Sequence, residues 1–81
     1  MTSDLRRAVE LLESGDWKAA HEIVQEDEDS RLFCWAHGIV HLMEGDLSNA
    51  RYWYRRAGRP PFSAAPPVAG EIRALKAEIE A

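Results

Sequence analysis

The dipeptide Gly-Asp occurs twice in this chain of 81 residues, and both copies stand in the same local frame. The segments LLESGDWKAAHEIV and HLMEGDLSNARYWY align with a constant offset of 30 residues. Glycine suits the left-handed residue that ends a helix, and aspartate caps the helix that follows. Each copy therefore predicts two antiparallel helices joined by a short turn. The identities that support the alignment are Leu12 with Leu42, Gly15 with Gly45, Asp16 with Asp46 and Ala20 with Ala50.

The spacing of apolar residues predicts an all-α fold without strands. The third of its five helices is apolar on nearly all sides, which places that helix at the centre of the molecule. The whole chain, residues 1–81, is expected to form a single domain, with helical hairpins at about 3–27 and 30–58, a proline-rich connector at 58–67 and a C-terminal capping helix at 67–81. The expected helices span about 3–14, 17–26, 31–44, 47–57 and 67–81, and the apolar stripe of the last one is Val68, Ile72, Leu75 and Ile79.

The second hairpin resembles a tetratricopeptide repeat, a helical unit of about 34 residues that stacks into a superhelix. The matching residues are Gly38, Gly45, Asp46, Ala50, Tyr54, Ala57, Pro60 and Pro61. The first hairpin keeps Ala8, Gly15, Asp16 and Ala20, but Val24 replaces the aromatic residue and Asp27 the final alanine. The resemblance covers residues 3–61 and implies a tetratricopeptide-like stack that presents a concave surface to peptides or protein partners.

Charge is spread unevenly along the chain, although the net value is only −4. Residues 1–30 carry −6, whereas residues 31–60 carry +3. The overall acidity makes nucleic-acid binding unlikely, because that function usually requires a basic excess. The longest apolar run, residues 32–43, is too short to span a bilayer. A start without a secretory signal and a single cysteine favour the reducing cytoplasm.

The stretch NARYWYRRAGRPP combines aromatic residues with arginines. Ala50, Trp53, Tyr54 and Ala57 recur at helical spacing and are expected to face the core, while Tyr52 is the aromatic residue expected to be exposed. Arg51, Arg55 and Arg59 lie four residues apart and form a stripe on another face. This stripe is interpreted as a rim. Arg51 and Arg55 are expected to pair with the acidic residues 26–29, and the alternative is that the stripe holds an anion or a carboxylate.

Cys34, His37 and His41 share one face of the third helix, because their spacing is i, i+3, i+7. Cysteine and histidine are good ligands for zinc. However, a structural zinc site usually draws ligands from two elements, and the only other histidine is His21. A core role is therefore favoured, and no metal or cofactor is expected. The chain offers no glycine-rich phosphate loop and no convincing catalytic group, so the protein is not expected to be an enzyme.

These patterns favour a non-catalytic module for protein–protein interaction. The alternative is a small metal- or anion-binding protein that uses Cys34, His37 and His41 or the arginine stripe. The inner face of the two hairpins is too apolar to remain bare. The last helix, a second subunit or a partner peptide is expected to cover it, and a homodimer is one such arrangement. The groove residues expected on this face are Leu5, Val9, Leu12, Leu32, Trp35, Ile39 and Met43.

Overall fold

A computed structural model describes residues 2–81 and contains five helices and, within those residues, no strand. The all-helical prediction is therefore confirmed. The helices are α1 (Thr2–Glu13), α2 (Trp17–Val24), α3 (Arg31–Glu44), α4 (Leu47–Arg56) and α5 (Val68–Glu80). Among residues 2–81, no helix is both long and apolar enough to cross a membrane.

The two Gly-Asp turns have the same geometry, as their matching sequences predict. Gly15 and Gly45 adopt φ values of 88° and 89°, which lie in the left-handed region. The Asp16 carboxylate accepts a hydrogen bond from the backbone N–H of Ala19 at 3.2 Å. The equivalent bond, from the N–H of Asn49 to the Asp46 carboxylate, is 3.3 Å long. One glycine and one aspartate therefore end one helix and begin the next at both turns.

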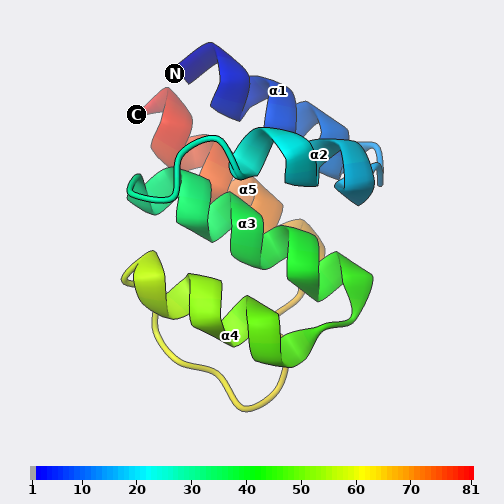
Figure 1. The fold of residues 1–81 in the computed structure, drawn as a ribbon, viewed down its shortest axis with the longest axis vertical. Helices are drawn as coiled ribbons and strands as arrows, with labels where there is room; N and C mark the ends of the chain where they lie inside the picture. Colours follow the sequence, from blue (N-terminus) through cyan, green and yellow to red (C-terminus); the bar gives the residue numbers. More distant parts are fainter. Residues whose placement is uncertain (1) are drawn as a thin grey trace.

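Helix α3 is the centre of the molecule and contacts each of the other four helices (Figure 1). Every residue from Phe33 to Leu42 is buried, including His37 and His41. Gly38 lies at the closest approach of α3 and α4, because a Cβ atom at this position would overlap the ring of Tyr54. Ala50, Trp53, Tyr54 and Ala57 are buried and Tyr52 is 43% exposed, as their spacing predicts.

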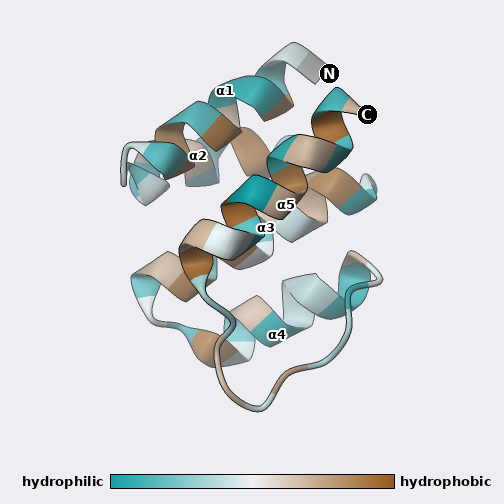
Figure 2. Ribbon diagram, turned by 180° about the vertical axis from the view of Figure 1, so that it is seen from behind, coloured by the Kyte–Doolittle hydropathy of each residue, from teal (hydrophilic) through white to brown (hydrophobic). Residues whose placement is uncertain are grey.

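Helix α5 packs against α1 and α3 of its own chain, and Figure 2 shows it lying across them. Ile72 and Leu75 of its apolar stripe are buried, while Val68 and Ile79 are partly buried. A polar contact anchors the same helix, because the Glu71 carboxylate accepts hydrogen bonds from Trp35 and Tyr54. The capping helix therefore covers the apolar face within its own chain.

The apolar face that was predicted to form a binding groove is therefore packed inside the chain, with α5 against α1 and α3. Five of its seven residues, Leu5, Val9, Leu12, Trp35 and Ile39, are at most 3% exposed. Leu32 and Met43 are partly buried against the same core. The five buried side chains form contacts inside the chain, so a partner could reach them only if this packing opened. The sequence pattern identified an apolar face correctly, but that face is closed to ligands in this conformation.

Candidate functional site

A pocket lies between α4 and the connector that leads to α5. Its volume is about 450 Å³. Figure 1 shows the connector as a loop that runs beside α4. All three charged residues that line the pocket are arginines, so its electrostatic character is cationic. The lining residues are Arg51, Tyr54, Arg55, Gly58, Arg59, Pro61 and Phe62.

Arg51 holds the connector against α4 through two hydrogen bonds. Its Nε atom donates to the carbonyl oxygen of Phe62 at 3.1 Å, and its Nη2 atom donates to that of Ser63 at 3.0 Å. The Phe62 ring meets the Tyr54 ring edge to face, with 5.2 Å between the centroids. Arg51 therefore builds the wall of the pocket as well as contributing charge to it.

Arg59 enters the pocket from the end of α4. Gly58, at a φ of 73°, allows the chain to turn there, and the N–H of Arg59 donates to the carbonyl of Tyr54. The Arg59 guanidinium stacks on the Trp35 ring at 3.9 Å from the ring centroid. Its Nε atom is buried and has no hydrogen-bond partner among residues 2–81. A buried cationic donor without a partner is costly, so an anion at this position would stabilise the site.

Tyr54 forms the floor of the pocket and connects it to α5. Its hydroxyl donates to Oε1 of Glu71 at 2.5 Å, and Nε1 of Trp35 donates to the same oxygen at 3.2 Å. Burial, together with this hydrogen bond and the charge of Glu71, raises the pKa of the Tyr54 hydroxyl far above its ordinary value. Tyr54 therefore stays protonated at neutral pH and acts as a structural donor.

The structure brings the three predicted rim arginines into one pocket, but it places the acidic segment elsewhere. The interpretation that Arg51 and Arg55 pair with residues 26–29 is wrong. Instead, Arg56 donates from Nη2 to the carbonyl of Glu28 at 2.9 Å and lies 4.0 Å from the Asp29 carboxylate. Arg56 points toward that loop because it follows Arg55 by one helical step of about 100°.

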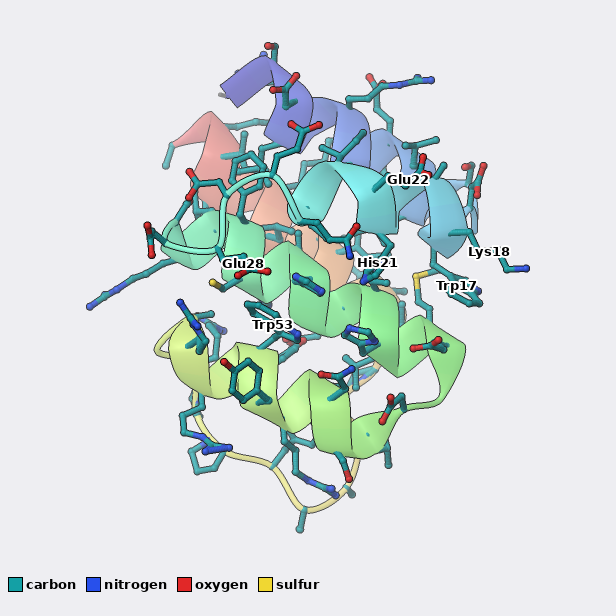
Figure 3. The ribbon with its side chains drawn as sticks, in the orientation of Figure 1. Trp17, Lys18, His21, Glu22, Glu28 and Trp53 are labelled. Carbon is teal, nitrogen blue, oxygen red and sulfur yellow. The ribbon has the colours of Figure 1, made fainter. Side chains whose placement is uncertain are left out.

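A second polar cluster lies on the other side of α4, where His37 and His41 of α3 meet His21 of α2. The ring centroids of the three imidazoles are between 4.9 and 5.3 Å apart. His37 also stacks on the indole of Trp53 at 3.9 Å, with only 10° between the ring planes. Figure 3 shows His21 pointing from α2 toward α3, and Trp53 between α3 and α4.

Two of the three histidines in the cluster are buried. His37 is 3% exposed and His41 is 6% exposed, whereas His21 is partly buried. Burial is the main cause that lowers the pKa of His37 to about 3, and the neighbouring His41 and His21 add to it. His41 is fixed by Glu44, whose Oε1 atom lies 2.8 Å from Nδ1 of the ring.

Cys34 does not join the histidine cluster, although its spacing on α3 suggests it. Its thiol donates instead to the carbonyl of Glu28, with 3.2 Å between Sγ and the oxygen. Burial, as the main cause, raises the pKa of this thiol, so the nucleophilic thiolate is disfavoured. The set of Cys34, His37 and His41 is therefore wrong as a ligand set. His21 of α2 lies beside His37 and His41 instead of Cys34, and spacing within one helix cannot show this contact between two helices.

Comparison with protein-family models, with curated protein sequences and with solved structures finds no match for this chain. Its function is therefore inferred from the two sites.

Proposed function

We propose that the protein is a non-catalytic interaction module that binds an acidic segment of a partner protein in the arginine pocket. The observation that carries this proposal is the convergence of Arg51, Arg55 and Arg59 on one pocket beside two aromatic rings. The repeated Gly-Asp turns support a divergent pair of tetratricopeptide-like antiparallel hairpins as the scaffold. In that family, binding surfaces usually serve peptides, which agrees with a peptide ligand here.

The guanidinium groups suit carboxylates. Arginine donates through a planar fork that matches the two oxygens of a carboxylate. Arg55 is exposed, and no hydrogen bond or ion pair within residues 2–81 occupies its side chain. The buried Nε of Arg59 adds a donor that lacks a partner. Arg51 uses two of its donors on the connector, so Arg55 and Arg59 are the primary anion-binding groups.

The aromatic walls select for an apolar group next to the anion. Phe62 and Pro61 of the connector line the pocket together with Tyr54 of α4, whose ring meets the Phe62 ring edge to face. A cavity of about 450 Å³ is of the size that encloses a small ligand or one to two side chains. The expected recognition element is therefore a leucine or an aromatic residue followed by one or two acidic residues.

A peptide ligand fits the chain better than a nucleic acid does. The net charge of −4 repels a long polyanion, whereas a short acidic segment needs only the local cationic field. The groove under α5 is a weaker candidate, because its residues are already buried within the chain. The pocket needs no such rearrangement.

The test is calorimetric titration with synthetic six-residue peptides, in which leucine or phenylalanine precedes two glutamates. Matched peptides carry glutamine in place of glutamate, and a random single-stranded DNA oligonucleotide represents the nucleic-acid alternative. The acidic peptides should bind saturably, and the glutamine peptides should not. Equal binding of both peptide sets, or binding of the oligonucleotide alone, would contradict the proposal.

Two charge-reversing variants locate the binding site. Arg55→Glu should weaken peptide binding at least about tenfold, because it removes a charge-assisted hydrogen bond and introduces repulsion. The matched control is Arg73→Glu on α5, because Arg73 is also exposed and lies outside the pocket lining. It should change the affinity less than about twofold if the local field, rather than the net charge, binds the peptide.

A further inference from the structure

The histidine cluster has properties that its role in the core does not explain. Three imidazoles from two helices converge, and one ligand nitrogen from each ring lies within 4.8 Å of the other two. In a tetrahedral zinc site with bonds of about 2.0–2.1 Å, ligand nitrogens lie about 3.3 Å apart. Small side-chain rotations would close the remaining distance, and the helical backbone would not have to move. Three histidines and an open fourth position are also a donor set that zinc accepts.

His37 provides a second and independent observation. Its side chain is 97% buried, and its Nδ1 atom has no hydrogen-bond partner among residues 2–81. A buried polar nitrogen without a partner destabilises a fold, so such atoms are rare in native structures. The stacked indole of Trp53 holds the ring in its plane. His37 is therefore oriented in advance and lacks only a partner.

His41 is arranged as a metal ligand with a carboxylate behind it. Glu44 lies 2.8 Å from Nδ1 of His41, one helical turn further along α3. When Nδ1 carries the proton and donates it to Glu44, Nε2 has its lone pair free for a metal ion. Carboxylates hold metal-binding histidines in this way, fixing the tautomer and increasing the basicity of the ring.

His21 reaches the cluster from a second helix, α2. His21 is partly buried, whereas His37 and His41 are buried. A structural zinc site usually draws its ligands from two elements, and here α2 is the second element beside α3.

We infer that His21, His37 and His41 bind one divalent zinc-class ion, with Glu44 positioning His41. The ion would join α2 of the first hairpin to α3 of the second, and would stabilise their packing. This site is separate from the arginine pocket and does not depend on the proposed peptide binding. The residues on which it rests lie on helices, so it should be formed before the ion arrives.

The test uses the full chain without a histidine tag, stripped with chelator and titrated with Zn²⁺ by calorimetry. Co²⁺ serves as the spectroscopic probe, because its visible absorption reports the coordination geometry. We expect one ion per chain, a tetrahedral Co²⁺ spectrum and a higher melting temperature in the presence of Zn²⁺. The absence of saturable uptake at one ion per chain would overturn the inference.

Three variants distinguish this site from other metal-binding arrangements. His21→Gln should lower the Zn²⁺ affinity by about a hundredfold, and Glu44→Gln, which acts only through His41, by about tenfold. Cys34→Ser is the matched control and should leave the affinity unchanged, because its thiol bonds to Glu28 instead. Circular dichroism verifies that each variant is folded. Binding that survives His21→Gln, or that is lost in Cys34→Ser, would assign the ion to other residues.

Discussion

The histidine cluster and the arginine pocket each contact one of two neighbouring residues of α4. Trp53 stacks on His37 in the cluster, and Tyr54 lines the pocket. The cluster is buried, and its donors all come from helices. The pocket is cationic, and much of its wall belongs to the irregular connector. Two sites of opposite character are thus separated by one helix.

This difference shows how burial determines what each group can bind. Three imidazoles that converge inside the protein offer nitrogen lone pairs, and the ligand they suit is a cation. Guanidiniums at the surface stay charged and offer only N–H donors, so they suit an anion. The same helix supports both sites because Trp53 and Tyr54, adjacent in sequence, point about 100° apart.

The largest expected effect concerns acid and the buried cluster. The folded-state pKa of His37 is about 3, below its ordinary value of 6.5. The unfolded chain therefore binds a proton between these values, whereas the folded chain does not, and stability falls as the pH drops below about 6.5. In metal-free protein we expect a loss of about 2 kcal/mol at pH 5 relative to pH 7.5, measured by urea denaturation.

His37→Gln is the matched control, because glutamine does not titrate. Its stability should depend much less on pH between 7.5 and 5, even if its absolute stability is lower. The comparison is made at pH 5, above the ordinary pKa values of most carboxyls. An identical pH dependence in both proteins would show that His37 is not the group held neutral by the fold.

The next effect concerns the glycine at the boundary between the two sites. A Cβ at Gly38 would overlap the Tyr54 ring, which is buried and held by Glu71. Gly38→Ala should therefore destabilise the protein by about 1–2 kcal/mol, despite the better helix propensity of alanine. In Gly70→Ala on α5 the new Cβ would make only ordinary contacts, the nearest at 3.7 Å, so we expect a gain of up to about 1 kcal/mol. Urea denaturation should give opposite signs for the two variants, and equal signs would refute the close approach of α3 and α4.

Features encoded within one turn or one helix could be predicted from the sequence. The left-handed Gly15 and Gly45 and the capping Asp16 and Asp46 depend on local backbone chemistry, and the structure confirms them. The apolar stripe of α5 likewise predicted a helix docked on an apolar face. Periodicity is sufficient for such predictions because it determines which side chains share a helical face.

Features that join distant elements could not be predicted. His21 reaches the cluster only because α2 packs on α3, and the spacing on α3 pointed to Cys34 instead. The rim arginines were identified by their spacing, but Phe62 was missed because the connector has no periodicity from which to infer a contact. The acceptor shared by Trp35 and Tyr54 is Glu71, which depends on how α5 is placed.

The smallest expected effect tests whether the pocket depends on its connector while the cluster does not. Arg51→Lys keeps the positive charge, but lysine cannot reproduce the two hydrogen bonds to the Phe62 and Ser63 carbonyls. Because Arg51 is partly exposed, the stability loss should be at most about 1 kcal/mol. Amide hydrogen exchange should become faster in the connector, and acidic-peptide affinity should fall by more than the stability change predicts, because the Phe62 wall is released. The α3 amides near His37 and His41 should exchange at the wild-type rate, and the Zn²⁺ affinity should be unchanged.

If the connector amides exchange at the wild-type rate, the two hydrogen bonds do not hold the connector against α4. If the α3 amides change as well, the two sides of α4 are coupled, and the two sites cannot be treated as independent.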